Sequence, residues 1–169
     1  MPIADCGFPF INVVPGSNPP QLMSARDMLL KKGPTTAVEI GFDPGLFHTD
    51  PAKVQDAIKA ATATPPAKLV DALIDTGAVD SCIDEDLAQE LKLPLIDQAD
   101  GAGIGGKEKF NVYLGHIRIA ALGTIQYGRF MGVKLKAGDQ PHQALLGRTV
   151  LQNMVLVYDG RDGTVRLAV

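Results

Sequence analysis

The sequence predicts a mostly β domain with two or three short helices. The 169 residues include 18 Gly and 12 Pro but no Trp, and such frequent turn-forming residues favour short strands over long helices. From Leu95 onward the apolar segments are predominantly strand-like. Only short segments before that point repeat apolar residues at helical spacing.

The length and composition are those of one folded domain. A chain of 169 residues can fill one core well, whereas a second full domain would be cramped. Hydrophobic residues make up 46% and charged residues 21% of the chain, which is too apolar for a disordered protein. We expect the domain to span residues 34–169, with residues 1–33 forming an N-terminal arm or a pro-segment.

The charge distribution and the cysteines exclude several classes of function. The formal net charge is −3 and no run of Lys or Arg occurs, so we expect no nucleic-acid partner and no membrane partner. The first twenty residues lack the basic start and long apolar core of a signal peptide. Cys6 and Cys82 are the only cysteines, and two thiols without metal-ligand spacing indicate a cytoplasmic protein.

The first third of the chain contains two predicted helices and one strand. Prolines interrupt the arm, which otherwise looks irregular, but apolar residues share one face over 21–32, and Gly33–Pro34 ends this helix. Residues 35–42 are rich in β-branched side chains and precede a turn, as a strand does. An Asp-Pro pair then begins a helical insertion near residues 51–62.

The middle of the chain is a strand, a turn and a short helix. Residues 68–74 are strand-like and lead directly into Asp75. Asp84 is a good N-cap, since Leu87 and Leu91 follow on one helical face and Pro94 comes just after the helix.

The last part of the chain is predicted to be strands joined by turns. The glycine cluster at 101–106 separates two strand-like segments, which indicates a flexible hairpin tip that could approach a ligand closely. Residues 128–137 form another predicted strand. A short helix follows residues 145–148, and residues 155–158 and 164–168 form a hairpin around the turn Asp-Gly-Arg-Asp-Gly.

Three apparent sites are not supported by their surroundings. The glycine cluster matches G-x-G-x-x-G and the start of a P-loop, but a phosphate site needs a helix next, and a strand-like segment follows. His48, His116 and His142 are scattered without zinc-ligand spacing, so no metal site is expected. Cys82 paired with a distant histidine is conceivable as a thiol protease, although a buried core cysteine is the favoured interpretation.

Asp75, Thr76 and Gly77 are the strongest candidates for chemistry. The tripeptide alone is usually a turn in which the aspartate binds local backbone. The context differs here, because the glycine hairpin and then Ala-Leu-Leu-Gly-Arg, ending at Arg148, follow in that order within about seventy residues.

This order of motifs resembles the retropepsins, the aspartic proteases of retroviruses, and their cellular and bacterial relatives. Residues 72–78 look like the catalytic loop, 101–106 like the flap, and 145–148 like the element that crosses behind the loop. The resemblance covers about residues 67–169, and the strand at 35–42 is similar to the first strand of the family. It implies a closed acid-protease β-barrel, with one lobe per chain.

The resemblance also implies a mechanism and a set of site residues. A water held between two aspartates loses a proton to the ionised one, while the neutral one donates to the peptide carbonyl, so no metal or organic cofactor is needed. Catalysis is assigned to Asp75, Thr76 and Gly77. Substrate binding is assigned to residues of the loop, the flap and the crossing element: Ala78, Asp80, Gly103, Ile104, Gly105, Gly106 and Leu145. Structural roles are assigned to Leu146, Gly147 and Arg148.

The chain contains only one Asp-Thr-Gly and no Asp-Ser-Gly. The second aspartate must therefore come from an identical chain across a twofold axis, so we expect an obligate homodimer that cleaves peptide or protein substrates below neutral pH. One departure from the viral pattern is Val79, where viral members often have an aspartate that pairs with the arginine. Arg148 could instead pair with Asp80 or with another group.

Three alternatives remain open at this stage. The fold could serve as a silent dimeric scaffold that binds peptides, although such a protein has no physical need for a repulsive carboxylate pair. The glycine hairpin could be a tight turn without a ligand. The arm at 1–33 could shape the dimer, cover the cleft, or require removal before the enzyme is active.

Overall fold

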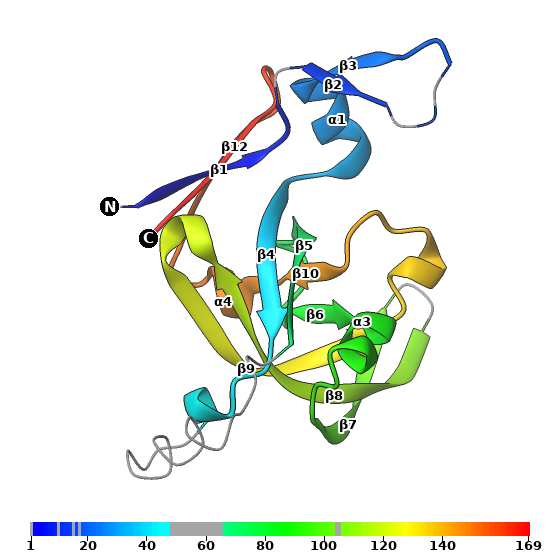
Figure 1. Ribbon diagram of the computed structural model, residues 1–169, viewed down its shortest axis with the longest axis vertical. Coiled ribbons are helices and arrows are strands. Elements are labelled where there is room, and N and C mark those ends of the chain that lie inside the picture. Colours follow the sequence, from blue (N-terminus) through cyan, green and yellow to red (C-terminus); the bar gives the residue numbers. More distant parts are fainter. Residues whose placement is uncertain (1, 10, 15, 17, 48–65, 104–105) are drawn as a thin grey trace.

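The computed structural model is mainly β, as the sequence predicted, with three α-helices among the residues that it describes (Figure 1). These residues are 2–9, 11–14, 16, 18–47, 66–103 and 106–169. The predicted helical insertion near 51–62 lies outside them.

Six strands close into a barrel. In order around the barrel, they are β4 (Thr35–Gly41), β5 (Ala67–Ile74), β10 (Ala144–Leu146), β6 (Cys82–Asp84), β9 (Thr124–Val133) and β8 (Gly106–Ile119). The ring closes because β8 also pairs antiparallel with β4, where Ile117 lies opposite Ile40. Strand β10 runs parallel to β5, and β6 runs parallel to β9, while the remaining neighbours are antiparallel. The predicted closed barrel is therefore confirmed.

One further strand, β7 (Leu95–Gly103), lies outside the ring and pairs with the first half of β8. The two strands form the predicted glycine-rich hairpin, and their pairing extends to Gly103 opposite Gly106. Residues 104–105, at the tip, lie outside the described part of the chain.

The two ends of the chain meet in a second sheet. Strand β12 (Thr164–Ala168) lies between β1 (Ile3–Gly7) and β11 (Val155–Asp159), and all pairs are antiparallel. Strands β11 and β12 are the predicted C-terminal hairpin. The termini consequently lie side by side in Figure 1, since Ile3 is opposite Ala168.

The rest of the arm packs beside this sheet. Strands β2 (Ile11–Val13) and β3 (Leu22–Ser24) pair with each other, and α1 (Ala25–Lys32) follows. The helix begins later than the predicted residue 21, because the residues before it are paired in β3. Ser24 caps the helix, with its Oγ accepting a hydrogen bond of 3.1 Å from the backbone N–H of Asp27.

Two short helices and three 3₁₀ turns complete the described structure. Helix α3 (Glu85–Glu90) begins after the predicted N-cap Asp84, and α4 (Arg148–Leu151) is the short helix expected near the chain's end. The 3₁₀ turns are at Pro44–Phe47, Ala120–Leu122 and Lys136–Gly138. The strand predicted at 128–137 is in fact β9, which ends at Val133, because the chain bends into the turn at Lys136–Gly138.

The core fills the barrel with aliphatic side chains from facing strands. Val38 and Ile40 on β4, Ala72 on β5 and Ile83 on β6 are completely buried. Their alternation with more exposed residues is the two-residue period of a strand, and their burial is the main favourable term in folding.

Within the described ranges, no helix has the length and apolar character that crossing a bilayer requires.

Candidate active site

Asp75 lies at the point where β5 leaves the barrel. The side chain before it, Ile74, is buried, whereas Thr76 and Gly77 are exposed. The Asp75 N–H donates to the Leu146 carbonyl oxygen at 3.0 Å, which extends the parallel pairing of β5 with β10 by one residue. The core thus fixes the backbone from which this half-buried aspartate projects.

The carboxylate of Asp75 is oriented by its own loop. Its Oδ1 accepts hydrogen bonds from the N–H groups of Gly77 at 2.9 Å and Ala78 at 3.2 Å. Within the described residues, Oδ2 has no hydrogen-bond partner. One oxygen is therefore held by the turn while the other remains available, as a proton-transfer group requires.

Residues 146–149 pass directly behind this loop, and their backbone N–H groups bind it. Arg148 N–H donates to the Ala78 carbonyl and Thr149 N–H donates to the Val79 carbonyl, both at 3.0 Å. Gly147 N–H donates to Ser81 Oγ at 2.9 Å. The crossing element that the sequence placed behind the catalytic loop is thus in contact with it along its length.

The side chain of Arg148 binds the front part of the same loop. Its Nη1 donates to the carbonyl oxygens of Thr76 at 2.8 Å and Gly77 at 3.1 Å. This identifies the partner that the sequence left open, since Val79 offers no carboxylate and the guanidinium binds backbone instead. In this single chain Arg148 thus occupies the carbonyl oxygen of Gly77, one of the three residues to which the resemblance assigns catalysis.

The other predicted site residues are divided between two regions. Ala78 and Leu145 are half-buried next to the loop, Asp80 is exposed within it, and Leu146 is completely buried in β10. Gly103 and Gly106 lie at the far end of the β7–β8 hairpin. The predictions for Ile104 and Gly105 fall outside the described residues.

The thiol near the loop is not suited to nucleophilic chemistry. Burial raises the pKa of Cys82 to about 11, and the negative charges of Asp80 and Asp75 act in the same direction. A thiol with such a pKa stays protonated at neutral pH, whereas a nucleophilic cysteine needs the thiolate. This result agrees with the core role favoured for Cys82.

The two described histidines are also core residues. His116 and His142 are buried, and burial lowers the pKa of each below the ordinary value, which keeps the imidazoles neutral. His142 shares a 2.8 Å hydrogen bond with Thr35 Oγ1. In the described part of the chain, no three His, Cys, Asp or Glu side chains gather as metal ligands. His48 lies outside that part.

Sequence reasoning missed two residues that shape this region. Ser81 binds the crossing element, but a serine before a cysteine belongs to no motif. Glu85 accepts hydrogen bonds from Asn111 and Tyr113 on β8, whereas the sequence showed only an acidic residue in the first turn of a helix. Both contacts join residues far apart in the chain, so no local pattern indicates them.

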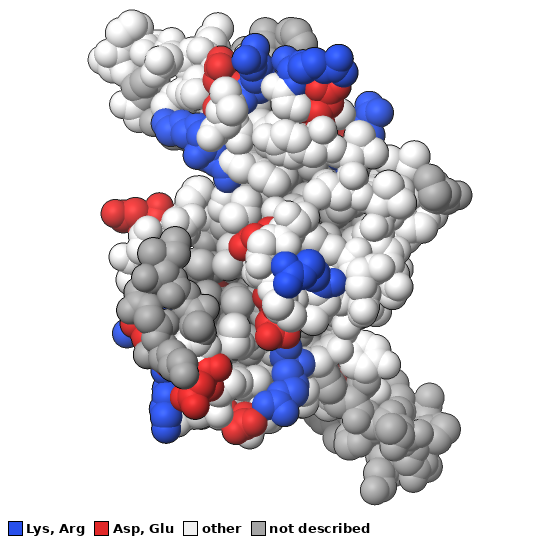
Figure 2. Space-filling model, turned by 180° about the vertical axis from the view of Figure 1, so that it is seen from behind, with Lys and Arg blue, Asp and Glu red and all other residues white. Residues whose placement is uncertain are grey.

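The charges on one face of the molecule are mixed in sign. In Figure 2, acidic and basic side chains of the described residues lie next to one another on this face.

A comparison with known protein families finds a match over the middle of the chain. A family model described as aspartyl protease matches residues 66–150, which is half of the chain. The matched segment begins just before β5 and ends within α4, so it includes the Asp75 loop, the hairpin and the crossing element. No curated protein matches the chain significantly.

Proposed function

The chain belongs to the retropepsin-like aspartyl protease family, and from this we propose that it is a homodimeric aspartic endopeptidase. The observation that carries the proposal is the Asp75 loop. Its carboxylate directly follows a barrel strand that ends at the buried Ile74, and residues 146–149 support the loop from behind. A rigidly presented carboxylate with one oxygen available is half of the site that this chemistry needs.

The second half would come from an identical chain. Because the sequence has a single Asp-Thr-Gly, a twofold axis beside the loop would bring Asp75 next to the Asp75 of a second copy. Two carboxylates at such short range share one proton, as the paired aspartates of aspartic proteases do. The working pH should therefore lie below neutral, where the shared proton is retained.

In the proposed reaction, a water lies between the two carboxylates. The ionised carboxylate takes a proton from the water, whose oxygen attacks the peptide carbonyl, and the neutral carboxylate donates its proton to the carbonyl oxygen. On collapse of the tetrahedral intermediate the C–N bond breaks, and the carboxyl group that took the water proton gives it to the leaving nitrogen. The other carboxylate takes a proton from a hydroxyl group of the intermediate, which becomes the carboxylic acid product, so the pair again shares one proton. Only the two carboxylates and water take part.

The hairpin and the loop would bind the substrate. By the family resemblance, Ile104 closes over an extended peptide, and Gly103, Gly105 and Gly106 offer backbone N–H groups to it. Leu145, half-buried beside the loop, would form part of an apolar wall. We therefore propose a preference for bulky apolar side chains next to the cut bond.

Cleavage of casein between pH 4 and 7 tests the proposal, with wild type and Asp75→Asn compared at equal concentration. Asparagine preserves the size of the side chain and can still accept the Gly77 hydrogen bond, so the variant should fold normally. We expect cleavage by the wild type and a loss of at least about a thousandfold in the variant, because the proton-transfer group is gone. Equal cleavage by both proteins would contradict a role for Asp75.

A further inference from the structure

Among the residues that the structure describes, no barrel strand pairs with the outer part of the β7–β8 hairpin. Strand β9 pairs with β8 only from Val112, opposite Met131, to Ile119. Between Gly106 and Asn111, β8 pairs only with β7, which is itself an edge strand. The support of the main sheet therefore ends at residue 112, which is the root of the projecting hairpin.

The backbone of the hairpin is irregular at the same level. The pairing register shifts between Leu95, opposite Tyr113, and Asp97, opposite Val112. Such a bulge bends a strand and increases its twist. The hairpin thus has a local bend at the residue where its support from β9 ends.

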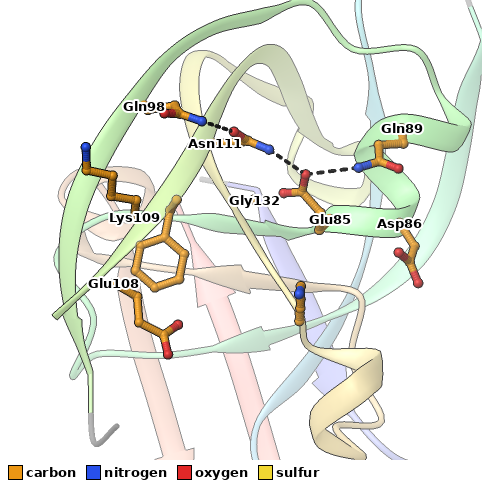
Figure 3. Close-up of a pocket in the computed structure, with 10 residues that line it drawn as sticks. Glu85, Asp86, Gln89, Gln98, Glu108, Lys109, Asn111 and Gly132 are labelled. Atoms are coloured by element: carbon orange, nitrogen blue, oxygen red, sulfur yellow. Dashed lines mark hydrogen bonds between the residues drawn. The ribbon is translucent and has the colours of Figure 1, made fainter. Parts of the chain in front are cut away.

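A cavity of about 490 Å³ lies beside the hairpin. Its walls come from three elements: Gln98, Lys109 and Phe110 on the hairpin, Asp86 and Gln89 on α3, and Lys134 after β9. Figure 3 shows the hairpin on one side of this space and α3 on the other. Hydrogen bonds from Asn111 and Tyr113 on β8 to Glu85 on α3 connect the two sides of this space.

Glu85 is the centre of these hydrogen bonds. Its Oε1 accepts hydrogen bonds from Tyr113 Oη at 2.6 Å, Asn111 Nδ2 at 2.9 Å and Gln89 Nε2 at 3.1 Å. Gln98 Nε2 on β7 donates in turn to Asn111 Oδ1 at 3.0 Å, so both arms of the hairpin are joined to the carboxylate (Figure 3).

The surroundings favour the charged carboxylate. Burial alone would raise the pKa of Glu85, but the hydrogen bonds from Tyr113, Asn111 and Gln89, with the nearby Lys134, outweigh it and lower the pKa below its ordinary value. Gly132 leaves room for the second oxygen, because a Cβ at that position would collide with Oε2. Charge-assisted hydrogen bonds of this kind are stronger than neutral ones.

We propose that Glu85 is a positioning residue that fixes the angle of the hairpin at its root. Its hydrogen bonds from Asn111 and Tyr113 hold β8 against α3 at the level where the support from β9 ends and the neighbouring strand β7 bulges. The consequence for substrate binding rests on the proposed function. If the hairpin closes over peptides, loosening its root weakens substrate binding more than it slows the chemical step.

Amide hydrogen exchange tests the proposal, with Glu85→Ala compared with Asp86→Ala. Asp86 is the next residue of α3 and lines the same cavity, so the control variant also removes one negative charge there. In the described structure, however, Asp86 makes no side-chain hydrogen bond to the hairpin. In Glu85→Ala we expect the amides of 98–103 and 106–111 to exchange about tenfold faster. The amides of β5 and β10 should be unchanged, and Asp86→Ala should match the wild type.

A reversed pair tests the contact itself. Asn111→Asp places a second carboxylate against Glu85 and should also accelerate hairpin exchange, through repulsion. The double variant Asn111→Asp, Glu85→Gln again pairs one amide with one carboxylate, but in swapped positions. Its amide hydrogen exchange should therefore return toward the wild-type rate. Unchanged hairpin exchange in Glu85→Ala, or equal acceleration throughout the barrel, would overturn the proposal.

Kinetics on a peptide substrate provides the functional readout. Glu85→Ala should raise KM about fivefold to tenfold while kcat changes less than threefold, because a looser hairpin mainly weakens substrate binding. The exchange measurement does not depend on activity. If the wild type does not cleave the peptide, the proposed peptidase activity is contradicted, but the exchange result for the hairpin remains valid. If Glu85→Ala shows normal hairpin exchange and normal cleavage, only the proposed role of Glu85 is contradicted.

Discussion

Gly147 lies directly behind the Asp75 loop, and its lack of a side chain lets the two segments approach each other. A Cβ at residue 147 would come within 2.5 Å of the Asp80 carbonyl oxygen and 2.8 Å of the Val79 carbonyl oxygen. Both atoms belong to the backbone of the loop, which hydrogen bonds from residues 148 and 149 hold in place. A side chain here could be accommodated only if the loop moved.

Gly147→Ala should therefore reduce both stability and activity. We expect the free energy of unfolding to fall by about 2–3 kcal/mol, as for overpacking of a tightly packed site, and cleavage to be lost with it. Gly138→Ala is the matched control, because no atom lies within 4 Å of its Cβ position, and it should change stability by less than about 0.5 kcal/mol. Denaturant unfolding of the two variants checks this prediction. Equal free energies of unfolding for Gly147→Ala and Gly138→Ala would show that the loop moves to accommodate the added methyl group.

The residues of the loop illustrate what a sequence can and cannot predict about a site. Asp75, Gly147 and Arg148 could be proposed from the sequence because a short motif contains each of them. The partner of Arg148 was not found, because backbone carbonyls have no sequence signature and their position depends on the path of the whole loop. Ser81 was missed for the same reason, since its hydrogen bond to Gly147 joins residues far apart in the chain.

Helix α3 depends on a cap that has a second structural role. Asp84 is 2% exposed, and its Oδ1 accepts a hydrogen bond from the Leu87 N–H at 3.4 Å. Its Oδ2 accepts another from the Lys136 N–H at 2.9 Å, in the 3₁₀ turn after β9. The same side chain thus begins α3 and joins it to the end of a neighbouring strand.

Asp84→Ala should cost more than the loss of an ordinary helix cap. Two backbone N–H groups lose their acceptor in a buried position, so we expect a loss of about 3 kcal/mol of unfolding free energy. Ser24→Ala removes the exposed cap of α1 and should cost only about 0.5–1 kcal/mol. Thermal or denaturant unfolding gives both values, and similar losses would mean that the contact with Lys136 contributes little.

The elements were predictable where their cause is local. β-Branched residues before a turn identified β4, a strand-like apolar segment identified β5, and a glycine-containing turn identified the C-terminal hairpin, while Asp84 was recognised as a cap. Strand β1 was missed because the prolines around it suggest irregular chain, whereas its order comes from pairing with β12 at the other end of the sequence. The end of β9 was misplaced because residues 134–137 continue the apolar alternation although the backbone has already turned.

At the scale of the whole molecule, closure of the barrel places the Asp75 loop and its crossing element together at the end of β5. One chain supplies one such loop. The sequence predicted this architecture because three motifs occur in the order typical of the family, which a closed six-stranded barrel accommodates. The central claim of our account is that two copies share one catalytic site.

Mixing wild type with Asp75→Asn tests this claim most directly. The two proteins are combined in equal amounts at constant total concentration, under conditions that let subunits exchange, and peptide cleavage is measured. If each site needs Asp75 from both chains, only wild-type pairs are active, and activity should fall to about one quarter of the pure wild type. Asp86→Ala in place of Asp75→Asn is the control and should leave full activity. A fall to only about one half would mean that each chain acts alone and would contradict the shared site.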